Sequence, residues 1–383
     1  MNSLTRREMI KGSVAAAALA FSQNPLTLFG ADEPKAGETL IPFLDVQPTD
    51  PKRPMLKWEQ LTSWITPNDQ TFSVSHYGQP AVETDKWSLE IAGLVKRPRT
   101  FSLSDIKSRR RKSVIATLEC SGNSSNPGFM GAIGNIRWTG TPLALVLKEC
   151  GLTTRGIEVV FFGADEKVEK IREQDYSQNF ARSLSMNDAL ADDVLLAYEM
   201  NGEPLPKEHG APLRLVVPGW FGIAWVKWLS RIEVLDRRYM SKYMAREYVT
   251  IRGEEKDGRT IWRETSVGPI DVKSIVARVV RRSDGILRVS GAAWTDGTPL
   301  KKVELKIDDG SWMTVQLDKK GQAKYAWTFW SCDWKKPEPG DHTLVSRAAD
   351  AEGRVQPAAD DPAIKLKKTY WEANQQYPRK IRI

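Results

Sequence analysis

Short runs of alternating apolar and polar residues recur after about residue 270, and they constrain the fold more than any other feature of the chain. Clusters of Gly, Asp and Pro, residues that favour turns, separate the runs. Strands at such even spacing are typical of an antiparallel β-sandwich. The expected strands are Ile275–Val280, Leu287–Trp294, Val303–Ile307, Tyr325–Phe329 and Thr343–Ala348.

The preceding 200 residues differ because they mix strand-like and helix-like runs. Trp87–Gly93 alternates like a half-buried strand, and Val159–Phe162 has the apolar run of a fully buried one. The length suits two domains. We therefore expect an α+β domain over residues 58–265, followed by an all-β sandwich over residues 266–383.

One helix is expected over residues 141–150. Thr141 would cap it, Pro142 would occupy its first turn, and Gly151 would end it in a left-handed conformation.

Residues 1–31 are expected to form a targeting segment. Thr5–Lys11 matches the twin-arginine pattern through Arg6 and Arg7, and Val14–Phe21 is an apolar run too short to span a bilayer. The twin-arginine route exports folded proteins, so the chain is expected in the periplasm or another extracytoplasmic space. An uncleaved segment could anchor it to the membrane. The alternative is an ordinary amphipathic N-terminal helix.

Residues 32–57 contain five prolines and are expected to form an extended surface arm or a linker. The net charge is +8 and the pI is about 9.2, yet Arg109–Lys112 is the only tight basic run. No aromatic or groove-reading residues accompany it, so nucleic-acid binding is not expected. A basic surface would instead attract an anionic substrate or an acidic redox partner.

Cys120 ends an apolar run and opens the loop Cys120–Asn123, which reads Cys-Ser-Gly-Asn. A thiolate presented this way can act as a nucleophile or bind a soft metal. The chain has three cysteines, too few for a disulfide framework or a four-cysteine zinc site. The other interpretation is a small buried hydrophobic residue, which we expect for Cys150 and Cys332.

The sequence around Cys120 resembles the molybdenum-site segment of the sulfite oxidase family. That family has a Cys-(Ala/Ser)-Gly-Asn loop followed by Gly-Ala-Ile-Gly and Arg-Trp-x-Gly, and residues 118–147 contain all three pieces in that order. Residues 194–228 resemble the family's cofactor-binding stretch. The resemblance covers roughly residues 60–383 and implies a molybdopterin-binding domain followed by an immunoglobulin-like dimerisation domain.

The resemblance also implies a molybdenum pyranopterin cofactor with Cys120 as its protein ligand. The phosphate tail of the pterin requires cations and donors, and the family positions that contact the cofactor correspond to six residues here. Trp225 replaces a family His, so only its backbone could substitute. The six are His76, Asp165, His209, Arg214, Trp225 and Lys227.

Tyr248 resembles the active-site tyrosine of the family through its (Arg/Lys)-(Asp/Glu)-Tyr context, and Tyr239 and Tyr243 are rivals. A phenol beside an oxo ligand could donate a hydrogen bond and gate a proton. Cys120 and Tyr248 are therefore the expected catalytic residues.

Two departures from the family affect the substrate. Val74 and Ser75 stand where the family has Arg-Asn, and Ser124 and Ser125 replace its paired arginines. Losing these guanidinium groups weakens binding of an oxyanion unless another cation substitutes. Arg137, Arg182, Lys227 and Arg246 are candidates for that substitution.

The resemblance implies an exported oxidoreductase that oxidises sulfite or a related sulfur compound by oxo transfer. The chain has no Cys-x-x-Cys-His motif for an attached haem, so electrons would leave to a separate carrier such as a cytochrome. A homodimer is expected. One alternative keeps the cofactor and uses a neutral substrate such as a sulfoxide. A third hypothesis is a non-catalytic exported binding protein.

Overall fold

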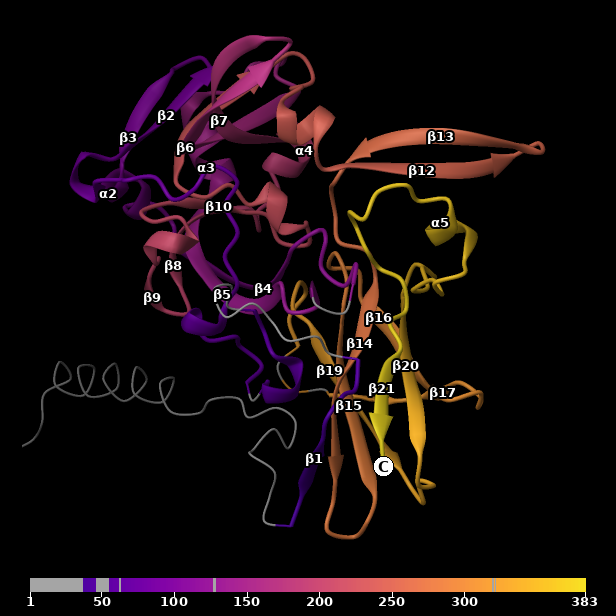
Figure 1. Ribbon diagram of the computed structural model, residues 1–383. Helices are drawn as coiled ribbons and strands as arrows, with labels where there is room; N and C mark the ends of the chain where they lie inside the picture. The colour runs from indigo at the N-terminus through magenta and orange to yellow at the C-terminus, as the bar shows by residue number, and fades with distance from the viewer. Residues whose placement is uncertain (1–36, 46–54, 62, 127–128, 319, 321) are drawn as a thin grey trace, which may run out of the picture.

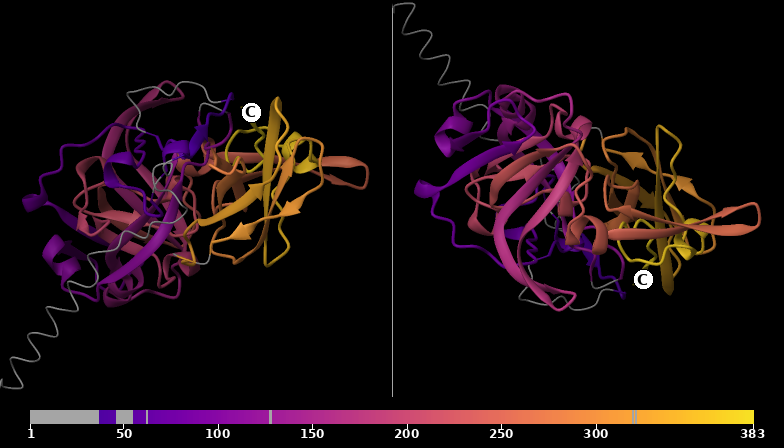
Figure 2. Two further views of the ribbon diagram at one scale, coloured as in Figure 1. Left: turned by 90° about the horizontal axis from the view of Figure 1, so that it is seen from below. Right: turned by 90° about the horizontal axis from the view of Figure 1, so that it is seen from above.

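The computed structural model describes residues 37–45, 55–61, 63–126, 129–318, 320 and 322–383. Two bodies lie side by side, one in the first two thirds of the chain and one in the last third (Figures 1 and 2). The expected targeting segment lies outside the described residues. Helices are few and short, and none in the described ranges is long and apolar enough to cross a membrane.

The first body contains two sheets. One, in the order β3-β2-β11-β6-β7, is mixed, because β2 and β11 are parallel. The other, in the order β10-β8-β5-β4, is antiparallel, and β9 pairs with β8. The strands expected near Trp87 and Val159 are confirmed as β2 and part of β6. The strands are β2 Ser88–Gly93, β3 Arg99–Ser102, β4 Lys112–Glu119, β5 Ile133–Pro142, β6 Glu158–Ile171, β7 Gln174–Ser185, β8 Leu195–Met200, β9 Glu203–Pro204, β10 Arg214–Val216 and β11 Leu229–Leu235.

The expected helix is present as α3, Leu143–Cys150, but its predicted cap is wrong. Thr141 still belongs to β5 and donates its hydroxyl to the carbonyl of Ile106, so Pro142 is the residue before the helix. Gly151 ends α3 with φ 73°, as expected. The other α-helices are α2 Leu103–Lys107, α4 Met186–Ala189 and α5 Pro362–Lys365.

A β-sandwich forms the second body, as expected, from sheets in the orders β1-β14-β15-β19-β18 and β17-β16-β20-β21. The run predicted at Tyr325–Phe329 is displaced, because its strand, β19, begins only at Thr328. The strands are β14 Lys273–Arg281, β15 Leu287–Trp294, β16 Leu300–Ile307, β17 Met313–Thr314, β18 Gln316–Leu317, β19 Thr328–Trp334, β20 Asp341–Asp350 and β21 Arg379–Arg382.

The proline-rich arm before the first body contributes a strand to the sandwich. Its residues Thr39–Ile41 form β1, which pairs antiparallel with β14 at the edge of the sandwich (Figure 1). Ile41 and Phe43 are buried in the core of the sandwich. Alternating apolar side chains, which burial favours, therefore override the proline-rich composition of this stretch.

Between the two bodies the chain forms a hairpin of β12, Val249–Lys256, and β13, Arg259–Ser266, which projects outward in Figure 1. Below it runs the segment that links β20 to β21, and Gly253 and Lys368 contribute backbone hydrogen bonds between the two. The largest apolar core is continuous across both bodies, since Trp58 stacks on Trp294 at 6.0 Å. The site described next lies at this junction.

Candidate functional site

Two adjoining cavities open around Cys120. The first, here called the deep pocket, spans about 660 Å³ including the space that opens to solvent. The second, here called the vestibule, shares Cys120, His76 and Tyr248 with it. The deep pocket is also lined by Phe72, Ser73, Val74, Ser75, Leu118, Ser121, Asp165, Phe180, His209, Arg214, Gly222, Ile223, Trp225, Lys227 and Trp228.

Cys120 lies at the end of β4, where that strand separates from β5. Its amide donates to the carbonyl of Ala132 at 2.9 Å, and its carbonyl accepts from the amide of Asn123 at 2.9 Å, so the loop turns immediately after the thiol. The side chain is half-buried and lines both cavities. Burial raises the pKa of the thiol to about 11. A metal cation bound at this position would stabilise the thiolate, which burial disfavours in the free protein.

Cys150 and Cys332 lie elsewhere. Cys150 is buried in α3, and Cys332 is half-buried in β19. Neither lines the deep pocket or the vestibule, in agreement with their expected structural role.

Arg214 brings an uncompensated positive charge into the deep pocket. Its guanidinium donates to two backbone carbonyls, of His209 at 2.9 Å and of Trp225 at 3.1 Å, and its Nε has no hydrogen-bond partner among the described residues. Burial lowers its pKa to about 9. Such a group is stabilised by an anion that enters the pocket.

Lys227 lies near Arg214 on the loop before β11. Its ammonium donates to Ser73 Oγ and to the carbonyl of Glu208, both at 3.0 Å, and both acceptors are neutral. Burial, followed by repulsion from Arg214, lowers the pKa of Lys227 to about 7. A buried and a half-buried cation, both with neutral partners, indicate a site for an anionic group such as a phosphate.

His209 and Asp165 are also buried at the deep pocket. Burial and then repulsion from Arg214 lower the pKa of His209 to about 4, so its imidazole is neutral. Burial raises the pKa of Asp165 to about 6, and its Oδ1 has no partner within the described residues. An acceptor without a donor is the second feature that a bound ligand would satisfy.

Trp225 contributes a carbonyl and not a hydrogen-bonding side chain to this pocket. Its indole N–H is already committed to the carbonyl of Trp220 at 2.9 Å, whereas its own carbonyl accepts from Arg214. The expected backbone contact between Trp225 and the cofactor stays a prediction.

His76 and Tyr248 form the boundary between the deep pocket and the vestibule. The phenol oxygen of Tyr248 lies 3.0 Å from His76 Nε2. Burial, the largest cause, raises the pKa of Tyr248 and lowers that of His76, so both are neutral near pH 7. Of the rivals, Tyr243 stacks on His76 and Tyr239 packs against Phe162, and neither lines the deep pocket or the vestibule.

The residues that replace the family arginines lie in two different places. Val74 and Ser75 line both cavities, but Ser124 and Ser125 line neither, because Ser124 is buried with its carbonyl bound by Gln375. The expectation that the serine pair shapes the pocket is therefore wrong. Of the candidate replacement cations, only Lys227 lines a cavity: Arg137 and Arg246 are exposed elsewhere, and Arg182 is buried against the carbonyls of Tyr243 and Val267.

Two aromatic residues of the last sandwich segment complete the vestibule and were not expected there. Trp371 stacks on Tyr248 with ring centroids 4.0 Å apart, and Tyr370 packs over Gly122. The only feature of the sequence that pointed to this role is that the two aromatic residues are adjacent. The other vestibule residues are Met55, Phe72, Ser73, Val74, Ser75, Phe129 and Ala132.

Comparison with known proteins follows the same division of the chain. Residues 76–243 match the oxidoreductase molybdopterin binding domain, and residues 264–371 match the Mo-co oxidoreductase dimerisation domain.

Two curated relatives are sulfite oxidases. The chain is 31% identical to sulfite oxidase of Gallus gallus, over 79% of this chain and 70% of that protein. It is 31% identical to mitochondrial sulfite oxidase of Drosophila melanogaster, over 77% of this chain. It spans only 55% of the latter's length.

The solved structure of the sulfane dehydrogenase SoxCD from Paracoccus pantotrophus is similar along most of the chain. The TM-score is 0.71 at 27% identity, and the match covers 94% of this chain and 95% of that one. The fold class expected from the sequence, a molybdopterin-binding domain followed by a β-sandwich dimerisation domain, is confirmed.

Proposed function

Because the chain belongs to the sulfite oxidase family of molybdopterin oxidoreductases, we propose that it is a mononuclear molybdenum oxidoreductase acting on a sulfur compound. One observation carries this proposal. The thiol of Cys120 lines the same pocket as Arg214 and Lys227, two cations whose hydrogen-bond partners are neutral. The pocket therefore combines a soft metal ligand with an anion site. A cofactor that carries both a metal and a phosphate would need this combination.

The residues of the deep pocket fit such a cofactor. Arg214 and Lys227 would hold its phosphate, and neutral His209 would add a donor or acceptor. Asp165 would accept from N–H groups of the pterin through its unpartnered oxygen. Cys120 would ligate the molybdenum, which supplies oxygen-atom transfer and two-electron redox chemistry when bound.

The protein residues nearest the reaction would be Tyr248 and His76. The phenol of Tyr248 can donate a hydrogen bond towards the pocket or accept one from His76 Nε2. Through this pair a proton can be held beside the reacting atoms without a buried charge. Trp371 stacks on the ring of Tyr248 and so fixes one side of this pair.

The substrate in this proposal is a reduced sulfur compound, with sulfite as the leading candidate. A second candidate class, a neutral compound such as a sulfoxide, is favoured by the vestibule: neither lysine nor arginine is among the described residues that line it. Anions bind best where a guanidinium is available. A relative that is a sulfane dehydrogenase is consistent with sulfur chemistry beyond sulfite.

The remaining functional assignments are parts of the same proposal. The twin-arginine pattern supports export to the periplasm with the cofactor already inserted. The match to a dimerisation domain supports a homodimer. Electrons would leave to a separate carrier such as a cytochrome.

Elemental analysis combined with a substrate panel tests the proposal. Protein matured with its cofactor should contain molybdenum and reduce an artificial acceptor with at least one sulfur compound. Sulfite, thiosulfate and dimethyl sulfide test oxidation, and a sulfoxide with a reduced dye tests the opposite direction. Molybdenum-free protein with no turnover would favour the non-catalytic alternative.

A further inference from the structure

The loop that carries Cys120 is held by the second body of the protein. Three residues of this loop, which spans residues 120–125, each present a backbone carbonyl to a donor from the sandwich or its C-terminal segment. The carbonyl of Ser121 accepts from the amide of Ala373 at 3.4 Å, that of Asn123 from Lys273 Nζ at 3.3 Å, and that of Ser124 from Gln375 Nε2 at 3.1 Å.

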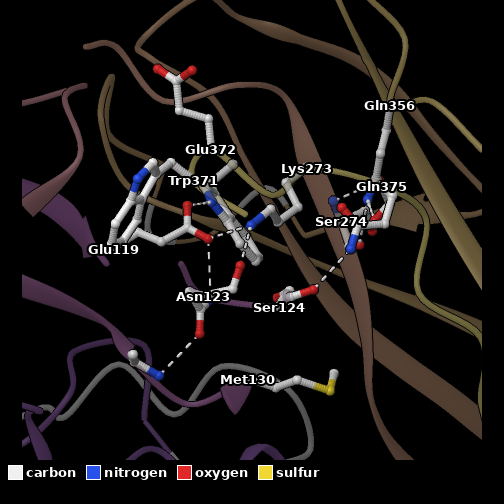
Figure 3. Close-up of polar contacts among 12 residues, drawn as sticks. Glu119, Asn123, Ser124, Met130, Lys273, Ser274, Gln356, Trp371, Glu372 and Gln375 are labelled. Carbon is white, nitrogen blue, oxygen red and sulfur yellow. Dashed lines mark hydrogen bonds and ion pairs between the residues drawn. The ribbon is translucent and has the colours of Figure 1, made fainter. Parts of the chain in front are cut away.

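A buried ion pair lies at the centre of these contacts (Figure 3). Lys273 Nζ is 2.6 Å from Glu119 Oε1, and the side chains are 2% and 0% exposed. The other carboxylate oxygen of Glu119 accepts from the indole of Trp294 at 2.7 Å. Asn123 donates to Glu119 Oε1 at 3.1 Å, so both residues that flank the turn are tied to Lys273.

The contacts form one path from the sandwich to the thiol. Lys273 is the first residue of β14, and Glu119 is the last residue of β4, directly before Cys120. Asn123 also accepts from the amide of Ala132, whose carbonyl binds the amide of Cys120. A shift of Lys273 would therefore displace both anchors of the loop.

A buried charged pair is a costly way to join two domains, because both ions lose their hydration. Apolar side chains would supply adhesion without that cost, and Trp58 and Trp294 already do so nearby. An ion pair with three further hydrogen bonds is directional, because it holds the ammonium and the carboxylate in one relative geometry.

We propose that Lys273 is a positioning residue for Cys120: the second body fixes the position of the thiol through Lys273 and Glu119, in addition to any part it takes in dimerisation. The inference rests on the proposed function only in taking Cys120 as the metal ligand. Loop order in the cofactor-free chain is independent of that role.

The test compares hydrogen exchange in cofactor-free, full-length protein. The reporters are the amides of Asn123, Ser124 and Ser125, which are hydrogen-bonded within or beside the loop. Glu119→Gln/Lys273→Met removes both charges together and avoids a buried uncompensated ion. Arg379→Met is the control, because the buried guanidinium of Arg379 pairs with the half-buried carboxylates of Asp45 and Glu59 and does not touch the loop.

The double variant should exchange these amides about tenfold faster than the wild type, and Arg379→Met should leave them within about twofold. In cofactor-loaded protein, X-ray absorption should show a wider spread of molybdenum–sulfur distances in the double variant only. Unchanged loop exchange in a folded double variant would overturn the inference. Absence of molybdenum from the wild type would instead contradict the proposed function and leave the exchange result valid.

Discussion

The phenol oxygen of Tyr248 and Nε2 of His76 are 3.0 Å apart, although the residues are separated by 172 positions in the sequence. Tyr248 adopts φ 53°, a left-handed conformation that costs a bulky residue about 1–2 kcal/mol. Stacking on Trp371 and a backbone hydrogen bond from Val267 to its carbonyl hold it there. Backbone strain retained at a pocket residue supports a functional role for the phenol.

Tyr248→Phe removes the hydroxyl and preserves the ring that stacks on Trp371. The expected result is a fall in kcat of about 100-fold with little change in melting temperature, because a positioned proton donor is lost but packing is not. Steady-state kinetics with an artificial acceptor measure it. Tyr239→Phe is the control, as Tyr239 packs against Phe162 outside both cavities. A kcat within twofold of the wild type would exclude the phenol from the chemistry.

Lys227 makes cofactor retention dependent on pH. Its pKa of about 7 in the free protein would be raised by a bound phosphate, which favours the charged ammonium. Binding therefore takes up a proton above about pH 7, and affinity should fall as pH rises, by at most about tenfold per pH unit. Binding of the pterin to cofactor-free protein at several pH values checks this sign. Lys227→Arg, which stays charged, should flatten the dependence, and an affinity that rises with pH would contradict it.

Val74 is 46% exposed and lines both cavities, so it is the position at which a cation could be restored with little disturbance of packing. Val74→Arg should lower the KM for sulfite by about tenfold and raise that for a neutral sulfoxide. Val74→Gln provides a neutral side chain of comparable length as the control. Equal sulfite KM values in the two variants would mean that charge at this position does not govern the substrate.

Export is expected to depend on Arg6 and Arg7. Replacing both by Lys retains their charge but removes the paired guanidinium groups of the pattern. Folded, cofactor-loaded protein should then accumulate in the cytoplasm. Cell fractionation with molybdenum analysis of each fraction measures this, and an unchanged periplasmic yield would refute the twin-arginine assignment.

The sequence predicted the strands and loops whose structure depends mainly on neighbouring residues. The alternating runs indicated β14, β15, β16 and β20 because a half-buried strand requires that period. The loop around Cys120 was predictable because the thiol and its Gly/Asn turn are contiguous. The arm containing Ile41 was misjudged, since only tertiary contacts reveal that its apolar residues enter the sandwich core.

The least predictable parts of the site come from distant segments. Trp371 lies 123 positions after Tyr248 and reaches it only because the chain returns from β20 past the hairpin. Glu119 reads as an ordinary polar residue at a strand end, and its burial follows from Lys273, 154 positions later. Ser124 was misplaced for a related reason: it follows Cys120 closely, but the turn directs it towards Gln375 and away from the pocket.

Molybdenum X-ray absorption on the wild type and Cys120→Ser tests the central claim most directly. The wild type should contain one molybdenum per chain, with the cofactor sulfurs and one further sulfur from the protein. In Cys120→Ser the pterin should be retained through Arg214 and Lys227, the sulfur shell should lose one sulfur, and turnover should be abolished. The same number of sulfur ligands in both proteins would contradict the assignment of Cys120 as the metal ligand.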